Sequence, residues 1–325
     1  MRRPVLALLA AASIALAVSG CGSGASSRGL RRATLILDFV PNAVHVGIYD
    51  ALGTGLYRRR GIDLRVIPPS STSDTLRLID AGKADFGIAD GIDVAQQIAS
   101  GQDAVAVMAI VQRPLGAVIA LAHEHLRSAA ALQGRTVGIT GVPSDLAVLD
   151  TEVAHAGGNP AKVHVVTIGF DGTTYLEAGK IDAFTGYWAD DGVQVALAGD
   201  PVQDFRLEQN GGPAYPGLIV FTTRREIARD PTLVRAFVAA TVQGYEQTLR
   251  DPGAALDQLL RQNPTIERRL AAASLRDYLP LFAEGGAVGE LHPAALRALS
   301  SWLYAHHLIK APIVPSRFGT NAFLP

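Results

Sequence analysis

The feature that most constrains this chain is a repeated alternation between short apolar runs and longer amphipathic stretches. From Ala33 onward, runs rich in β-branched and aromatic residues are each followed by a stretch of helical periodicity. Such alternation favours parallel β-sheets with helices packed on both faces, so the predicted fold class is doubly wound α/β. The expected strands are 34–40, 62–67, 85–89, 104–111, 118–122, 136–140, 163–168, 183–187 and 216–222.

A short phrase occurs twice in the sequence, as GKADF at 82–86 and as GKIDAF at 179–184. In both places a glycine suited to the end of a helix precedes a polar turn and then an apolar strand. Two units of the same plan predict two lobes of similar topology.

The order of the strands suggests how the chain is divided between these lobes. We expect lobe 1 to consist of 33–118 plus 219–325, and lobe 2 of 119–218. The chain then crosses between the lobes near 118–121 and again near 218–222, and two such crossings form a hinge. Ligands of open α/β sheets bind beyond the carboxyl ends of the strands, which here is the cleft between the lobes.

The N-terminal segment has the composition of an export signal. Arg2 and Arg3 precede the apolar run Val5–Val18, which is short for a membrane span, and small residues lead to Cys21. This order resembles the lipobox of bacterial lipoproteins, which predicts a signal peptide over 1–20, lipidation of Cys21 and a Gly/Ser-rich tether over 21–32. The protein would then sit on the extracytoplasmic face of the cell membrane. The alternative is an ordinary secretory signal in which Cys21 is incidental.

Composition excludes several other classes of protein. The chain carries 29 basic and 30 acidic residues, a formal net charge of −1, and 48% hydrophobic residues. It is too apolar to be disordered and too balanced in charge to be a dedicated nucleic-acid binder. A single cysteine cannot form an internal disulfide or a cysteine-rich metal site, and His123 and His125 have no third ligand nearby in the sequence. With no nucleophile elbow, phosphate loop or zinc-protease motif, we expect neither an enzyme, nor a metal site, nor a cofactor.

Three segments together resemble one known family. They are LDFVPNAVHVGIYDALGTGLYRRRGIDLRV, GKADFGIADGIDV and the terminal TNAFLP. They are similar to the extracytoplasmic solute-binding proteins for thiamine-pyrimidine precursors, of the NMT1/THI5-like family, which are related to eukaryotic thiamine-pyrimidine synthases. The chain differs from the usual family pattern at Phe39, where the family has Trp, and at Ala322, where it has Glu.

The resemblance implies a fold and a set of partners. The fold is a type II periplasmic binding fold, whose two doubly wound lobes are joined by a two-segment hinge. The implied ligand is a small heteroaromatic of the formylaminopyrimidine or hydroxymethylpyrimidine type. The implied partners are an ABC permease and its ATPase, served by a monomer anchored to the membrane through lipid.

In lobe 1, four residues are candidates for ligand contact. Phe39 lies at the carboxyl end of the first strand, and Asn42 and His45 follow it; there a ring face, an amide and an imidazole suit an aminopyrimidine. Asn42 also suits a helix cap, and His45 an internal hydrogen-bond partner. Asp90 follows the strand at 85–89 and could accept from an exocyclic amine or simply cap the next helix.

In lobe 2, the richest phrase is Gly186–Asp191, where Tyr187 and Trp188 end a strand and Asp191 follows them. We expect the two rings to stack on the ligand and Asp191 or Asp190 to bind an amine; a core aromatic and a helix cap are the alternatives. Ser144 opens a helix, as a cap or as a ligand donor. Tyr215, near the second crossing, is a candidate lid aromatic or a turn residue.

Three other functions remain open for the same chain. A sulfonate or nitrate ligand would need an arginine in the cleft, and Arg113 is the one candidate at its edge. Riboflavin would need a wider aromatic slot. A pyrimidine synthase would need the family's cysteine-rich iron-binding run, and no cysteine follows Cys21.

Overall fold

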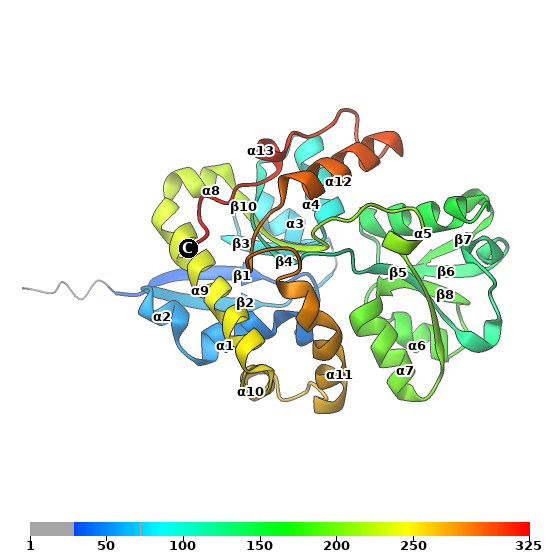
Figure 1. Ribbon diagram of the computed structural model, residues 1–325, viewed down its shortest axis with the longest axis horizontal. Helices are drawn as coiled ribbons and strands as arrows, with labels where there is room; N and C mark the ends of the chain where they lie inside the picture. The colour runs from blue at the N-terminus through cyan, green and yellow to red at the C-terminus, as the bar shows by residue number, and fades with distance from the viewer. Residues whose placement is uncertain (1–28, 72) are drawn as a thin grey trace, which may run out of the picture.

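Two lobes, each built on its own β-sheet, form the part of the chain that the computed structural model describes, residues 29–71 and 73–325 (Figure 1). Over these residues the sheet of lobe 1 has five strands in the order β2-β1-β3-β10-β4, and that of lobe 2 has five in the order β7-β6-β8-β5-β9. The strands of lobe 1 are β1 (Arg31–Ile36), β2 (Ile62–Ile67), β3 (Phe86–Ala89), β4 (Ala104–Val111) and β10 (Leu218–Thr223). Those of lobe 2 are β5 (Gly116–Leu121), β6 (Thr136–Ile139), β7 (His164–Thr167), β8 (Ala183–Tyr187) and β9 (Val202–Arg206).

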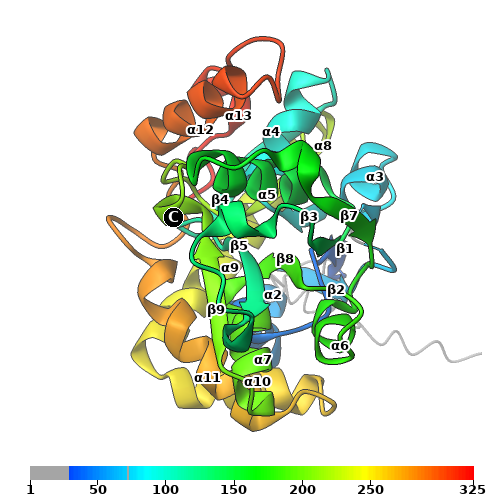
Figure 2. The ribbon, with the colours of Figure 1, turned by 90° about the vertical axis from the view of Figure 1, so that its right-hand side faces the viewer.

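Helices cover both faces of each sheet. In lobe 1 they are α1 (Val46–Gly53), α2 (Leu56–Arg59), α3 (Asp74–Asp80), α4 (Gly91–Ala99), α8 (Arg224–Arg229), α9 (Pro231–Arg250), α10 (Pro252–Gln262), α11 (Arg268–Tyr278), α12 (Pro293–Ala305) and α13 (Pro315–Phe318). In lobe 2 they are α5 (Pro143–His155), α6 (Gly172–Glu177) and α7 (Val193–Ala198). Figure 2, with lobe 2 toward the viewer, shows α5 on one side of its sheet and α6 and α7 on the other. The predicted α/β class with two doubly wound lobes is confirmed.

The cores explain this layering. In β5, Val118 and Ala120 point into the core beneath α5, whereas Ala117 and Ile119 point into the core beneath α6 and α7. Alternate residues of a strand face opposite sides, so a strand covered on both faces must be apolar throughout. β4 is buried along its whole length for the same reason. Its outer edge is bonded by the C-terminal segment, where the backbone N–H of Thr320 donates to the carbonyl of Ala106 over 3.0 Å.

Both sheets are mixed, where purely parallel sheets were expected. β10 runs antiparallel to β3 and β4, and β5 runs antiparallel to β8 and β9. Each of these two strands begins as the chain arrives from the other lobe. The chain therefore enters the sheet at the edge where the parallel strands end, and the new strand must run in the opposite direction. β9 was also missed, because its sequence, VQDFR, is too polar to resemble a buried strand.

The chain crosses between the lobes through 112–115 and through 207–217, and Figure 1 shows both connections between the lobes. The boundary expected after residue 118 falls inside β5, which pairs only with strands of lobe 2. The two crossings lie against each other: a Cβ atom on Gly217 would come within 2.3 Å of the carbonyl oxygen of Arg113. They therefore form a paired hinge.

The segment after β1 does not form one continuous helix. Gly55, whose φ of 76° lies in the left-handed region, separates α1 from α2, and a 3-10 turn precedes α1. The expected tether included Arg31 and Arg32, but both residues lie in β1, where Arg31 pairs with Ile62. The predicted signal peptide and Cys21 lie outside the described residues. No helix in the described part of the chain is both long and apolar enough to cross a membrane.

A close approach of α1 and α9 yields the first prediction. A Cβ atom on Gly244 would lie 2.0 Å from the carbonyl oxygen of Gly47, which is backbone and cannot rotate away. We expect Gly244→Ala to destabilise the protein by about 1–3 kcal/mol through overpacking. Gly253→Ala in α10 is the matched control, since its nearest neighbour would be 3.5 Å away. Melting temperatures measure both; equal values would contradict the prediction.

Candidate functional site

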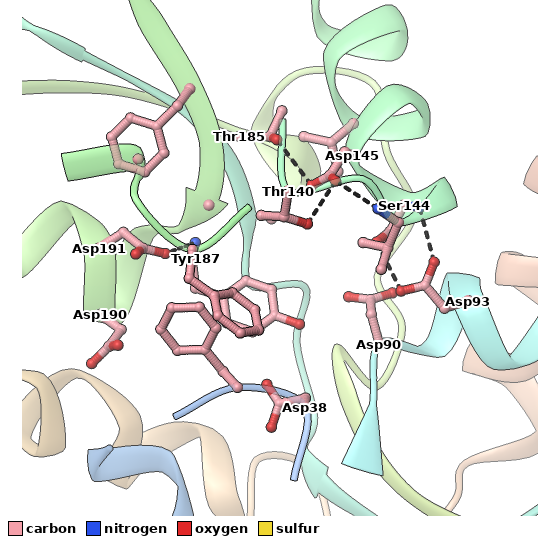
Figure 3. Close-up of a pocket in the computed structure, with 18 of the residues that line it drawn as sticks. Asp38, Asp90, Asp93, Thr140, Ser144, Asp145, Thr185, Tyr187, Asp190 and Asp191 are labelled. Atoms are coloured by element: carbon pink, nitrogen blue, oxygen red, sulfur yellow. Dashed lines mark hydrogen bonds between the residues drawn. The ribbon is translucent and has the colours of Figure 1, made fainter. Parts of the chain in front are cut away.

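A cleft between the lobes lies beyond the carboxyl ends of the parallel strands, where the hinge brings them together (Figure 3). It contains about 930 Å³ of space free of atoms, part of it open to solvent. Both lobes contribute to its walls. The polar and aromatic lining residues are Asp38, Phe39, Asn42, Asp90, Asp93, Thr140, Ser144, Asp145, Phe170, Phe184, Thr185, Tyr187, Asp190 and Asp191.

Aromatic rings meet across this cleft. Phe39 follows β1 in lobe 1, and Phe170 follows β7 in lobe 2. Their ring centroids are 4.6 Å apart and the ring planes are 85° apart, an edge-to-face contact between the lobes. Phe184 and Tyr187, both in β8, add rings to the same cleft. The walls therefore offer apolar surfaces suited to a flat ligand.

His45 does not line the cleft but holds residues that do. Its side chain is fully buried, and its Nδ1 accepts from the backbone N–H of Asn42 over 3.2 Å. Since Nδ1 accepts, Nε2 carries the ring proton and donates to Oδ1 of Asp38 over 2.8 Å. His45 therefore occupies the position of an internal hydrogen-bond partner, which was the alternative to ligand contact. Its hydrogen bond fixes the orientation of Asp38.

Asn42 lies on the cleft wall but most of its amide is already engaged. Its Oδ1 accepts from the backbone N–H of Val44 over 3.0 Å, which caps the following turn. Its Nδ2 donates to Oδ2 of Asp190 in lobe 2 over 3.0 Å. The donor–acceptor edge expected to face an aminopyrimidine is therefore reduced to a single free N–H.

Asp90 and Tyr215 form a pair at the hinge. Asp90 caps α4 by accepting from the backbone N–H of Ile92 over 2.7 Å, and it also lines the cleft. Tyr215, fully buried in the second crossing, donates its hydroxyl to Asp90 at 3.2 Å from either carboxyl oxygen. Tyr215 therefore supports the cleft wall from behind and does not line the cleft.

A second pair joins the lobes directly. Both oxygens of Asp93, in the first turn of α4, accept from Ser144 at the start of α5: one from its backbone N–H and one from its hydroxyl, each over 2.9 Å. Ser144 lines the cleft, but its hydroxyl is committed to this contact. The dashed lines between α4 and α5 in Figure 3 mark this junction.

Two more carboxylates are held by local donors in lobe 2. Asp145 accepts from the Thr140 and Thr185 hydroxyls and from two backbone N–H groups of the loop before α5. Asp191 accepts from the backbone N–H of Tyr187 over 2.7 Å across the π-helical turn Trp188–Gly192. This turn orients Asp191 toward the cleft.

Trp188 lies off the cleft wall and supports the hinge. Its Nε1 donates to the carbonyl of Pro114 in the first crossing over 3.3 Å, and the Arg206 guanidinium lies 3.9 Å from its ring centroid. The guanidinium covers one face of the ring, and Trp188 is not among the residues that line the cleft. The expected role of Trp188 as a ligand-stacking residue is therefore not supported by its position.

The charge of the cleft is one-sided. Six aspartates line it, and no lysine, arginine or histidine is among its lining residues in the described chain. Burial raises the pKa of Asp93 and of Asp190 to about 7 and that of Asp191 to about 6. Burial, reinforced by Asp93, places the pKa of Asp90 well above its usual range, and burial also raises that of Asp145. No basic side chain among the lining residues therefore offsets the free-energy cost of burying these carboxyl groups.

Arg113, the arginine nominated for an anionic ligand, is engaged elsewhere. Its guanidinium pairs with Glu284 over 2.9 Å and with Glu208, and it does not line the cleft. An anion in the cleft would therefore meet carboxylates without a counter-charge.

Six of the nine expected contact residues lie on the cleft wall, namely Phe39, Asn42, Asp90, Ser144, Tyr187 and Asp191. His45, Trp188 and Tyr215 lie behind it. The cleft residues that sequence analysis missed include Asp38, Asp93, Asp145 and Phe170. Phe170 had a usable signal, because it follows a predicted strand of lobe 2 between two glycines, as Phe39 follows the first strand of lobe 1.

The protein-family model described as NMT1/THI5 like matches residues 42–255 of this chain. A formylaminopyrimidine-binding protein of Halalkalibacterium halodurans is 27% identical over 307 residues, covering 92% of this chain and 93% of that protein. The riboflavin-binding protein RibY of Chloroflexus aurantiacus is 27% identical, covering 91% and 87%. The 4-amino-5-hydroxymethyl-2-methylpyrimidine phosphate synthase THI5 of Saccharomyces cerevisiae is 26% identical, covering 73% of each.

Solved structures share the fold. The alkanesulfonate-binding protein SsuA of Xanthomonas axonopodis, bound to MOPS, superposes with a TM-score of 0.71 at 16% identity, covering 90% of this chain and 99% of that one. The predicted two-lobe periplasmic binding protein fold is therefore confirmed. At this identity the match shows the fold and no ligand.

The raised pKa values predict how stability depends on pH. These aspartates bind protons more tightly in the folded chain than in the unfolded one, so the free energy of unfolding falls as pH rises from about 4 to about 7. With the pKa of Asp93 at about 7, we expect a fall on the order of a few kcal/mol for the ligand-free protein. Urea denaturation at pH 5 and pH 8 measures it, and Asp93→Asn should reduce the difference. Higher stability at pH 8 would contradict this account.

Proposed function

This chain belongs to the NMT1/THI5-like family, and on that premise we propose that it is the solute-binding component of an ABC importer. Its ligand is a thiamine-related pyrimidine of the formylaminopyrimidine or hydroxymethylpyrimidine type, bound between the lobes. The main observation in support of this ligand is a cleft lined by aromatic rings from both lobes and by hydrogen-bond acceptors. Similarity over nearly the full length to a formylaminopyrimidine-binding protein supports the same ligand class.

The polar groups of the cleft favour an amine-bearing ring. Carboxylates can only accept hydrogen bonds when ionised, and an aminopyrimidine offers the N–H groups to fill them. The rings of Phe39, Phe170 and Tyr187 supply faces and edges for stacking. A sulfonate or nitrate would lack a basic partner in the cleft, so anionic ligands of this class are disfavoured.

Riboflavin is the competing ligand, because a riboflavin-binding relative is also 27% identical to this chain. Its fused rings would need a longer slot. Phe39 and Phe170 touch across the cleft in the present arrangement, which suits a smaller ring.

Binding, not catalysis, is the proposed activity, although pyrimidine synthases belong to the same family. The resemblance to those enzymes implies a cysteine-rich iron-binding run, and the sequence has one cysteine, Cys21. Without that run, the chain has no equivalent of the synthase metal site.

In the proposed importer this chain has two protein partners, a permease and its ATPase, and one attachment to the membrane. We place the lobes at the extracytoplasmic face, as a monomer tethered through lipid on Cys21. Fatty-acid labelling of cells that produce the wild type and Cys21→Ser tests the attachment. Label and membrane association should both be lost in the variant; a labelled variant would contradict lipidation at this position.

Ligand identity is tested by calorimetric titration with formylaminopyrimidine, hydroxymethylpyrimidine, riboflavin, taurine and nitrate. We expect the pyrimidines to bind tightest. Tyr187→Ala should weaken binding about three- to tenfold or more, since a stacked ring contributes about 0.5–1.5 kcal/mol beyond its buried area. Tyr304→Ala, on the exposed side of α12, is the matched control. Binding of riboflavin alone, or of oxyanions alone, would refute the pyrimidine assignment.

A further inference from the structure

The carboxyl group of Asp38 presents an oxygen without a protein donor to the cleft. Its side chain is only 9% exposed, and it lines the cleft directly after β1. Oδ1 accepts from His45, whereas no donor from the described protein reaches Oδ2. An acceptor this buried, aimed into a cavity and without a donor, indicates a ligand group that donates to it.

The surroundings of Asp38 contain no positive charge. The titratable groups that act on it are His45 on the following turn, Asp90 before α4, Tyr187 and Asp190 from lobe 2, Tyr245 on α9 and Tyr278 at the end of α11. His45 offers Asp38 only its Nε2–H, because its Nδ1 accepts from a backbone N–H. The others are acids or phenols, so an ionised Asp38 has no basic partner in the protein.

The donors of the cleft are also scarce. The Thr140 and Thr185 hydroxyls donate to Asp145, the Ser144 hydroxyl to Asp93, and one N–H of Asn42 to Asp190. Among the described lining residues, the side-chain donors that remain for a ligand are the Tyr187 hydroxyl and the second N–H of Asn42. A neutral aminopyrimidine has two ring nitrogens that accept hydrogen bonds, so it would add acceptors to walls already rich in them. Protonation of one ring nitrogen turns that acceptor into a charged donor.

We propose that the cleft binds its pyrimidine as a cation, protonated on a ring nitrogen, with Asp38 as the counter-charge. The inference rests on the proposed function and specifies the charge of its ligand. One N–H bond forms on the ring as one O–H bond, of hydronium or of a protonated carboxyl in the cleft, breaks. When the protonated nitrogen is the one beside the exocyclic amine, the two present parallel N–H groups, the pattern that a carboxylate binds best.

His45 is the positioning residue of this site. It donates to Oδ1 of Asp38 and accepts from Asn42, and this pair of bonds leaves Oδ2 for the ligand. A glutamine at this position keeps one acceptor and one donor, whereas a leucine keeps neither. The two substitutions therefore separate the hydrogen-bonding role of His45 from its volume.

The experiment is ¹⁵N NMR of hydroxymethylpyrimidine labelled at its ring nitrogens, bound to the full chain at pH 8, where the free ligand is neutral. We expect a ring nitrogen to show the chemical shift and the one-bond proton coupling of a protonated ring. Asp38→Asn should abolish this signature and weaken binding at least tenfold. Asp171→Asn removes an exposed carboxylate outside the cleft and should change neither. His45→Gln should retain the signature and His45→Leu should lose it.

A measurement on the unmodified protein covers the case in which Asp38→Asn does not fold. The affinities of 4-aminopyrimidine and of its less basic 5-fluoro analogue should differ in the order of their basicity. Tight binding of a pyrimidine whose ring stays unprotonated at pH 8 would overturn this inference and leave the proposed function intact. Absence of binding by any pyrimidine would instead overturn the proposed function, and the cationic ligand with it.

Discussion

Hydrogen bonds accepted by buried carboxylates hold the two lobes together. Asp93 of lobe 1 takes both of its bonds from Ser144 of lobe 2, and Asp190 of lobe 2 takes one from Asn42 of lobe 1. An ionised carboxylate removed from water is costly unless its oxygens are bonded, so each contact is favourable only when the lobes meet. Among the described residues no basic side chain lines the cleft, so its carboxyl groups have no counter-charge from the protein there.

The topology explains why these carboxylates converge. In each lobe, one strand begins as the chain crosses the hinge and runs antiparallel beside strands that end there. Strand ends, helix starts and both crossings therefore lie at one interface. Asp38, Asp90 and Asp145 all follow strands, and each reaches the cleft because its strand ends at the hinge.

Sequence patterns predicted the elements whose burial is uniform and missed features that depend on the path of the chain. The strands at 62–67, 104–111 and 183–187 lie where periodicity placed them, and so does the α/β class. The antiparallel strands and the polar β9 were not predictable from local pattern. In the site, residue type identified Phe39 and Tyr187, but not whether His45 and Tyr215 face the ligand or stand behind it, since this depends on bonds between distant segments.

The hydrogen bond between Tyr215 and Asp90 joins the second crossing of the hinge to the cleft wall. Tyr215 belongs to the second crossing, and Asp90 is a wall residue at the start of α4. A rotation of the lobes that shifted this crossing would move the carboxyl group of Asp90 through the hydrogen bond between them. If the proposed ligand contacts Asp90, binding in the cleft and the angle between the lobes would be coupled, and a transporter that senses that angle could distinguish a loaded carrier from an empty one.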